Sequence, residues 1–384
     1  MSNLEVADIF NKFKHLLANL HPDQNKVINA ITNCRTKVLG GHKQKCSTCD
    51  FERPFFNSCR NRFCPKCGFL ARTKWIEKRM EDLLPCQYFH VVFTIPRDLS
   101  PIFLRNKRVC YDLLFKAASQ TLKEVAENPD NLGAEIGFIG ILHTWSQTLI
   151  DHPHVHFIVP GGGLNKEKTK WIKCKDGYLL PVSIFSIVFK QKLINLLRVA
   201  KSKGELRFTG DIGYLENNFT FQDLMDKCYN KNWVVYSKES FGGPEQVIKD
   251  LGGYTHRIGI SNYRLIKLEG EQIYFNYRDP KNPEKSKVMV MHVKEFMRRF
   301  LLHVLPKGYM RIRHFGLLGN RYRKIKIDII RKLNGIVEEI KNNLIESWSE
   351  QLFRVKNFNV KKCPKCSTGK LFETCFTENL LNSC

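Results

Sequence analysis

The chain has 384 residues, enough for about two or three domains with hydrophobic cores. It carries 62 Lys and Arg against 37 Asp and Glu, a formal net charge of +25. A field of this sign attracts polyanions, so we expect a nucleic-acid partner. No apolar run approaches the about 18 residues that a membrane-spanning helix needs, and residues 1–13 lack a basic region followed by an apolar one. These features exclude a membrane partner and predict a cytoplasmic, nucleoid-associated protein.

Apolar periodicity and residue type predict alternating helices and strands along the chain. Helical spacing predicts helices at 5–33 with a break at His21-Pro22, and at 69–84, 101–127, 183–203, 244–251, 293–305 and 324–349. Runs rich in β-branched and aromatic residues predict strands at 88–95, 134–147, 152–159, 171–182 and 233–236, and a strand meander at 263–292.

The stretch 142–163 contains four of the twelve histidines. His154 and His156 flank one apolar residue, so on a strand both imidazoles point to the same face. A hairpin that turns at 148–151 would place His143 opposite His156 and Trp145 opposite His154, where Cβ atoms are about 4.5–5.5 Å apart. We therefore expect His143, His154 and His156 to hold one metal ion.

The third ligand and the glycines after the hairpin each leave alternatives open. Gln147, His152 or His90 could replace His143, although a lone histidine such as His90 is more often a core residue. Gly161, Gly162 and Gly163 form either a flexible turn or a backbone that a ligand can approach closely.

Cysteine spacing predicts zinc. Cys46, Cys49, Cys64 and Cys67 follow the pattern C-x2-C-x14-C-x2-C, which is typical of a closed tetrahedral site with a structural role. Cys34, His42 and Cys59 are candidates for a second ion in the same region. Cys363 and Cys366 are candidates for a second zinc site in the tail, with Cys375 and Cys384 as further ligands. Four other cysteines stand alone and are interpreted as ordinary packed residues: Cys86, Cys110, Cys174 and Cys228.

Two further groups of residues carry chemistry. Tyr254 lies just past a predicted helix end beside His256 and Arg257, so it could act as a nucleophile with a cation near its target, although a packed tyrosine is the commoner case. Basic residues gather near the cysteines and, interleaved with aromatics, near 307–323, a combination that suits phosphate contacts and base stacking. The candidate DNA-binding residues are Arg60, Arg62, Lys66, Arg264, Arg311, Arg313, Arg321 and Arg323.

Six motifs in order resemble the rolling-circle insertion-sequence transposases of the HUH endonuclease class. They are the cysteine knuckles, HVVFTIP, LHTWSQ, HPHVHFIVPGGGL, YTHRIGISNYRL and FLLHVLPKGYMRIRHFGLLGNR. The resemblance implies that His154 and His156 bind Mg²⁺ or Mn²⁺ and that Tyr254 cleaves single-stranded DNA through a 5′-phosphotyrosine. One branch of the class has two tyrosines four residues apart. Asp250 stands at the first of these positions, so the chain resembles the single-tyrosine branch.

The elements and the resemblance together imply an α+β fold with a central antiparallel sheet, flanking helices and a small preceding zinc-binding domain. We expect four parts: a helical segment with the zinc-binding domain at 1–72, the nuclease domain at 73–265, a DNA-binding extension at 266–350 and a cysteine-containing tail at 351–384. The oligomeric state is open, with a dimer as one option. Two other readings are a replication initiator or relaxase-type nickase, and a zinc-bearing DNA-binding protein without catalysis.

Overall fold

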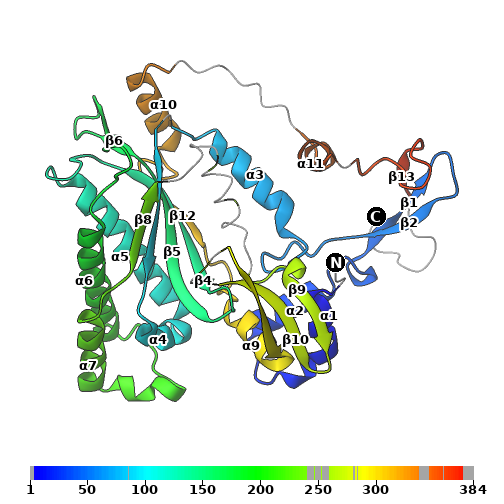
Figure 1. Ribbon diagram of the computed structural model, residues 1–384, viewed down its shortest axis with the longest axis horizontal. Helices are drawn as coiled ribbons and strands as arrows, with labels where there is room; N and C mark the ends of the chain where they lie inside the picture. The colour runs from blue at the N-terminus through cyan, green and yellow to red at the C-terminus, as the bar shows by residue number, and fades with distance from the viewer. Residues whose placement is uncertain are drawn as a thin grey trace.

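The computed structural model describes residues 4–84, 86–239, 246, 252, 259–279, 282, 284–336, 346–357 and 359–374. At its centre lies a five-stranded sheet in the order β12-β4-β5-β3-β8, with every neighbouring pair antiparallel (Figure 1). Its strands are β3 (Tyr88–Thr94), β4 (Gly137–Trp145), β5 (Asp151–Pro160), β8 (Val235–Glu239) and β12 (Ile312–Gly316). The predicted α+β class with a central antiparallel sheet is confirmed.

Helices cover one face of this sheet because the side chains that point there are apolar and aromatic. Phe93 of β3 packs edge-on against Phe185 and Phe189 of α6, and all three are fully buried. The neighbouring helices extend the same layer, which Figure 1 shows at the left of the sheet. The helices are α4 (Ser100–Arg105), α5 (Lys107–Glu127), α6 (Val182–Ser202) and α7 (Asn218–Tyr229).

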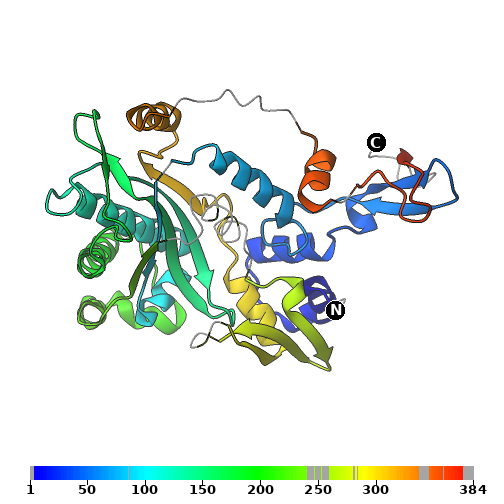
Figure 2. The same cartoon turned by 45° about the horizontal axis from the view of Figure 1, so that its top comes forward.

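The opposite face of the sheet is covered in part by α3 (Gly68–Met80). Trp75 of α3 packs against a small cluster formed by Tyr88, Ile141 and Ile158, one residue from each of the three central strands. Figure 2 shows α3 running from the central sheet toward the hairpin formed by residues 41–56. The histidines of β4 and β5 lie on this same face, because they share the parity of Ile141 and Ile158 along their strands.

A second, three-stranded sheet packs with the N-terminal helices. Phe275 of β10 contacts Phe296 of α9, and Phe300 of α9 packs edge-on against Phe10 of α1. This unit therefore joins segments from both halves of the chain. Its elements are α1 (Val6–Phe13), α2 (Pro22–Thr32), β9 (Leu265–Glu269), β10 (Gln272–Arg278), β11 (Ser286–His292) and α9 (Val293–Leu302).

The remaining elements are short. The third sheet contains β1 (Gly41–Cys46), β2 (Glu52–Phe56) and β13 (Leu371–Thr374), and the fourth contains β6 (Gly162–Leu164) and β7 (Trp171–Lys173). The last helices are α10 (Arg323–Leu333) and α11 (Trp348–Lys356). Short 3-10 helices complete the set at Lys14–Leu16, Lys37–Leu39, Arg97–Leu99, Gly210–Glu216 and Asn262–Arg264. Among the described residues no helix is long and apolar enough to cross a membrane.

One expectation of domain organisation differs from the structure, and another part of the chain gains a long-range partner. We expected 266–350 to form a separate extension, but β12 completes the central sheet by pairing with β4. We expected a cysteine-containing tail at 351–384, and its β13 pairs with β1 near the other end of the chain. Both features arise from long-range strand pairing, which local residue patterns do not encode. The predicted helix 244–251 lies outside the described residues except for Gln246.

The glycine triplet permits close packing within the protein. A Cβ at Gly162 would lie 2.6 Å from the Trp171 ring of β7, and a Cβ at Gly163 would lie 2.5 Å from the Glu135 backbone oxygen. Neither expected interpretation, a flexible turn or the approach of a ligand, describes this segment. The absent side chains let β6 pair with β7 and let Leu164 bridge to Glu135.

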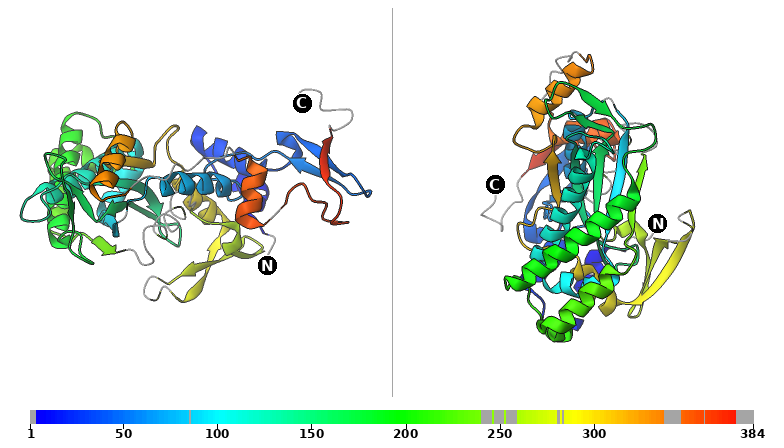
Figure 3. Two further views of the ribbon diagram at one scale, coloured as in Figure 1. Left: turned by 90° about the horizontal axis from the view of Figure 1, so that it is seen from above. Right: turned by 90° about the vertical axis from the view of Figure 1, so that its left-hand side faces the viewer.

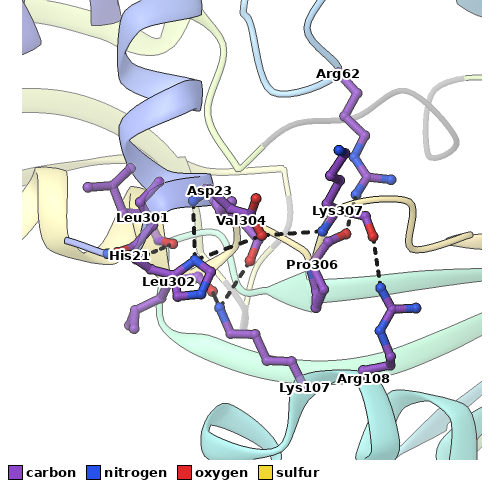
Figure 4. A network of polar contacts seen from close by, with 11 residues as sticks. His21, Asp23, Arg62, Lys107, Arg108, Leu301, Leu302, Val304, Pro306 and Lys307 are labelled. Carbon is purple, nitrogen blue, oxygen red and sulfur yellow. Dashed lines mark hydrogen bonds and ion pairs between the residues drawn. The ribbon is translucent and has the colours of Figure 1, made fainter.

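A polar network fixes the loop between α9 and β12 (Figure 4). Lys107 at the start of α5 donates to the backbone oxygens of Leu302 at 2.6 Å and of Val304 at 3.0 Å. Arg108 donates to Lys307 O at 2.8 Å, and Lys307 N donates to an Asp23 carboxylate oxygen at 3.3 Å. The network thus ties the helix layer, the N-terminal helices and the strand-bearing C-terminal segment to one loop.

Asp151, at the start of β5, lies near Lys107 but has no hydrogen-bond partner for either carboxylate oxygen among the described residues. Burial raises the pKa of Asp151 to about 7, and the nearby Lys107 charge opposes this. Burial likewise lowers the pKa of Lys107 to about 8. Asp151 is therefore mostly protonated in the folded state below pH 7.

We predict that Asp151→Asn changes the pH dependence of folding. With a carboxyl pKa of about 7 in the folded state and 3.8 otherwise, the folded wild type binds more protons between these values and loses stability as pH rises. The variant lacks this loss. Its unfolding free energy minus that of the wild type should therefore increase as pH rises from 4.5 to 6.5. Urea denaturation across this range measures it, with Asp211→Asn at an exposed carboxylate as control. A difference that stays constant with pH would contradict the prediction.

Candidate active site

Three histidines converge on one face at the end of the β4–β5 hairpin. The metal-binding atoms available on His143, His154 and His156 all lie within 4.8 Å of one another. The ring centroids of His143 and His156 are 4.4 Å apart, and those of His154 and His156 are 4.7 Å apart. His143 and His156 are buried, with exposed fractions of 3% and 7%. The expected convergence of these three imidazoles is therefore present.

The pairing that brings them together differs from the expected register. His143 lies opposite His154, and His156 lies opposite Ile141. We expected His143 opposite His156 and Trp145 opposite His154, so the register is wrong by two residues. A register irregularity between His143 and Trp145 places Trp145 opposite Asp151. Because side chains alternate with a period of two, the shift leaves all three histidines on the same face.

The hydrogen bond of His154 determines which nitrogen can bind a metal. Its Nδ1 lies 2.6 Å from the backbone oxygen of His152. A carbonyl oxygen only accepts, so Nδ1 carries the proton and Nε2 carries the lone pair. Burial lowers the pKa of His154 to about 4; the hydrogen bond to the His152 backbone opposes this shift, and the charges of His152 and His90 add to it. The ring is thus neutral near pH 7, which is the form that ligates metals.

His90 of β3 supports the cluster from the next strand. Its Nε2 lies 2.7 Å from Nδ1 of His156, and the two rings are almost parallel at 4°. When Nδ1–H of His156 donates in this bond, Nε2 of His156 carries the lone pair that a metal needs. His90 therefore orients the His156 ring. It does not belong to the group of three histidines that could hold a metal ion.

A cavity of about 300 Å³ opens beside the three histidines. Its walls also include Trp145, which stacks on His143 at 4.9 Å, and Gln147 and His152, the other candidate ligands. Gly259 and Arg264 complete the wall from a distant part of the chain. The space is large enough for a small group such as a phosphate with its water. The full lining is His143, Trp145, Ser146, Gln147, His152, His154, His156, Gly259 and Arg264.

The hairpin turn 146–150 is held by residues from other elements. Arg264 donates to Gln147 O at 2.6 Å, and Arg299 donates to Thr148 O at 3.2 Å. His303 lies 3.0 Å from Leu149 O through Nε2 and 3.2 Å from the Thr144 hydroxyl through Nδ1. Since the carbonyl accepts, Nε2–H donates and Nδ1 accepts from Thr144.

Sequence reasoning missed His303 and Arg299 as supports of the site. His303 does lie in the FLLHVLP motif, which was the available signal. Tyr254, His256 and Arg257 lie outside the described residues. The nearest described positions are Gly252 and Gly259. A Cβ at Gly252 would lie 2.1 Å from Cδ1 of Ile76 in α3, the helix that packs on the histidine-bearing face.

Among the described residues, eight cysteines form two clusters of four, and the expected quartet is wrong. Cys375 and Cys384 lie outside the described residues. Cys64 and Cys67 join Cys34 and Cys59, whereas Cys46 and Cys49 join Cys363 and Cys366. The predicted role of His42 as a ligand is not seen, because its Nε2 lies 3.5 Å from Glu373 and its ring stacks on Phe55. The tail pair is not a separate site. Each Cys-x-x-Cys pair instead finds its partner through tertiary structure.

The first cluster fits a tetrahedral zinc ion. Sγ of Cys67 lies 3.4 Å from that of Cys34 and 3.6 Å from that of Cys59. Its hydrogen bond from the Cys64 thiol lowers the pKa of Cys67 to about 4, while that bond raises the pKa of Cys64. One thiolate is thus already favoured. Four sulfur ligands leave no open position, so zinc here has a structural role.

The predicted DNA-binding residues fall into two groups. Several are engaged within the protein: Arg62 donates to Tyr309 O at 2.7 Å, Arg313 pairs with Asp112, and Arg323 lies 3.3 Å from Asp82. Lys66 pairs with Glu5, and Arg311 is buried, so burial lowers its pKa to about 10. Arg60 and Arg321 are exposed.

Comparison with known proteins identifies relatives over nearly the whole chain. The family described as a putative transposase matches residues 137–325, and the transposase zinc-binding domain matches residues 5–95. The chain is 42% identical over 376 residues to putative transposase y4qJ of Sinorhizobium fredii, covering 96% of this chain and 94% of that protein. It is 26% identical over 315 residues to the transposase for insertion sequence element IS801 of Pseudomonas savastanoi pv. phaseolicola, covering 80% and 73%. No solved structure matches.

We predict that His303→Ala loosens the hairpin turn. The change removes a donor to Leu149 O and an acceptor for Thr144, and both partners are buried. The unfolding free energy should fall by about 1–3 kcal/mol. Urea denaturation measures the loss, and His15→Ala at an exposed histidine serves as control. Equal stability of the two variants would contradict the bracing role.

Proposed function

Since this chain belongs to the IS91 family of transposases, as its relatives and matched domains establish, we propose that it cleaves and rejoins single-stranded DNA at insertion-sequence ends. The reaction would run through a 5′-phosphotyrosine on Tyr254. The observation that carries this proposal is the group of three imidazoles, His143, His154 and His156, beside a phosphate-sized cavity.

The three imidazoles fit a divalent ion. Their metal-binding atoms converge, and His154 is neutral with its lone pair on Nε2. Imidazole ligands suit Mn²⁺ better than Mg²⁺, which prefers oxygen, and both agree with the resemblance. A bound ion would supply Lewis-acid polarisation of the scissile phosphate and a template for its orientation.

Tyr254 is the proposed nucleophile. It lies five positions before Gly259 of the cavity wall, and an extended chain spans at most about 18 Å over five positions. Gly252, two residues before it, packs against α3 on the histidine-bearing face. This short chain distance supports the proposal that Tyr254 acts at the cavity.

In the proposed step, one phosphoryl group of the DNA strand moves from a 3′-oxygen to Tyr254. The phenol oxygen of Tyr254 attacks phosphorus, the bond from phosphorus to the 3′-oxygen breaks, and the phenol proton ends on the released 3′-hydroxyl. A phenol of pKa about 10 is only about 0.1% ionised at pH 7, so the reaction needs help with the proton. We propose His256 as its acceptor and Arg257 as the cation that stabilises the phosphate charge.

Rejoining uses the same chemistry in reverse. The phosphotyrosine ester conserves the energy of the cleaved bond, so an incoming 3′-hydroxyl can displace Tyr254 without a nucleoside triphosphate. A single nucleophile implies sequential transfers or the participation of a second protomer.

Two of the candidate arginines are placed to support DNA binding, and a third has another role. Exposed Arg60 and Arg321 can contact phosphates of the strand, and the latter lies over the Tyr322 ring at 5.0 Å. Arg264 has a different role, because its guanidinium donates to Asn276 O and Gln147 O in the cavity wall. It is a positioning residue for the hairpin turn.

We predict that Tyr254→Phe abolishes the covalent adduct. Wild-type protein, Mn²⁺ and a labelled single strand carrying the cognate element end should give a protein–DNA species stable to denaturing gel electrophoresis. Tyr214→Phe, at an exposed tyrosine on the Gly210–Glu216 segment, is the matched control and should retain the adduct. An adduct formed by Tyr254→Phe would identify another nucleophile, and no adduct with wild type would favour binding without catalysis.

We predict graded losses of Mn²⁺ affinity at the histidine site. His156→Ala removes a ligand and should abolish measurable binding. His90→Phe removes the ring nitrogen that bonds His156 Nδ1 and should weaken binding by about 10–100-fold. Electron paramagnetic resonance of free Mn²⁺ measures both, with His292→Phe at an exposed histidine as control. Unchanged affinity in His156→Ala would contradict the assigned ligand set.

A further inference from the structure

Four cysteines from opposite ends of the chain meet where β1 lies beside β13. Sγ of Cys46 lies 3.7 Å from Sγ of Cys366, and Sγ of Cys49 lies 3.8 Å from Sγ of Cys363. Around a tetrahedral zinc with bonds of about 2.3 Å, neighbouring sulfurs are about 3.8 Å apart. A disulfide has sulfurs about 2.05 Å apart. The observed spacing therefore fits one shared ion and not two disulfides.

The two knuckles also present backbone donors to their sulfurs. Thr48 N donates to Sγ of Cys46 at 3.4 Å, and Gly369 N donates to Sγ of Cys366 at 3.3 Å. Position 369 requires glycine, because a Cβ there would lie 2.3 Å from Sγ of Cys46. Backbone N–H groups therefore point at two of the four sulfurs. Such donors stabilise the thiolates that zinc binds.

The sheet that carries the cluster has almost no hydrophobic core. The hydrophobic cluster described there has three buried members, Cys46, Cys363 and Leu371, and Phe51 is a partly buried aromatic packed against them. A three-stranded sheet of this size needs a disulfide, a metal or a larger apolar face to remain folded. An ion bound by the four sulfurs would supply the stability that a hydrophobic core does not provide in this sheet.

The tail is attached to the N-terminal region at two places. β13 pairs with β1 from Lys43–Thr374 to Cys46–Leu371, and Figure 3 shows this strand against the β1–β2 hairpin at one end of the molecule. The second attachment is α11, whose Arg354 lies 2.6 Å from a Glu77 carboxylate oxygen of α3. This ion pair is largely exposed and contributes little by itself.

We propose that Cys46, Cys49, Cys363 and Cys366 bind a structural zinc ion that fastens the C-terminal tail to the N-terminal zinc-binding region. The matched family ranges, 5–95 and 137–325, contain neither Cys363 nor Cys366. The chain thus holds two zinc ions. This one cross-links positions 314 residues apart, so it restricts the unfolded chain more than the first ion does.

Zinc content tests the proposal. The background is His154→Ala/His156→Ala, so that zinc at the histidine site is not counted, and the protein is purified under reducing conditions. We expect two zinc ions per chain in this background, one after adding Cys363→Ser/Cys366→Ser, and two after adding the control pair Cys86→Ser/Cys174→Ser. One ion in the background, or two in the Cys363→Ser/Cys366→Ser variant, overturns the proposal.

A second measurement does not depend on cysteine substitution. A protease recognition sequence is inserted after the exposed Gly335, and the protein is cleaved there under reducing conditions. We expect the tail fragment to co-elute with the body in size-exclusion chromatography while zinc is bound, and to separate after a chelator removes it. Co-elution of zinc-free protein, or separation with zinc still bound, overturns the fastening role.

Discussion

Alternation of side chains along β4 and β5 is the constraint on which the candidate site depends. Leu142, Val155 and Phe157 point to the helix-covered face, where each is almost fully buried. Slipping either strand by one residue would move these apolar side chains out of the core and the histidines into it. The hydrophobic core therefore fixes which face carries the three imidazoles, and the ligand set exists before any ion binds.

The same alternation explains what could be predicted from the sequence. His143, His154 and His156 were placed together correctly because parity alone decides the face, and an error of two residues does not change parity. Their pairing was wrong because the irregularity beside Trp145 and the length of the turn decide the register. That turn is held by Arg264, Arg299 and His303, which are more than a hundred residues away in sequence. No local pattern encodes such contacts.

The cysteines show the same limit more clearly. Each Cys-x-x-Cys pair was recognised, since the knuckle is a local structure. The partner of each pair was not recognised, because the spacing between two Cys-x-x-Cys pairs is compatible with a shared site but does not require one. Cys64 and Cys67 share a cluster with Cys34 and Cys59, which lack a paired motif. Cys46 and Cys49 share a cluster with a pair from the tail. Only the pairing of β1 with β13 brings that last pair within reach.

The two kinds of metal site differ in what holds their ligands in place. The histidines stand on a sheet whose opposite face is packed by phenylalanines of β3, β5 and α6, so the sheet needs no ion to keep them converged. The sheet of β1, β2 and β13 has a core made largely of the cysteines themselves. Its geometry must come from the ion, since thiolates brought together without a cation repel one another. An ion at the histidines would therefore find its ligands already converged, whereas the zinc proposed for Cys46, Cys49, Cys363 and Cys366 is a condition of the fold of its sheet.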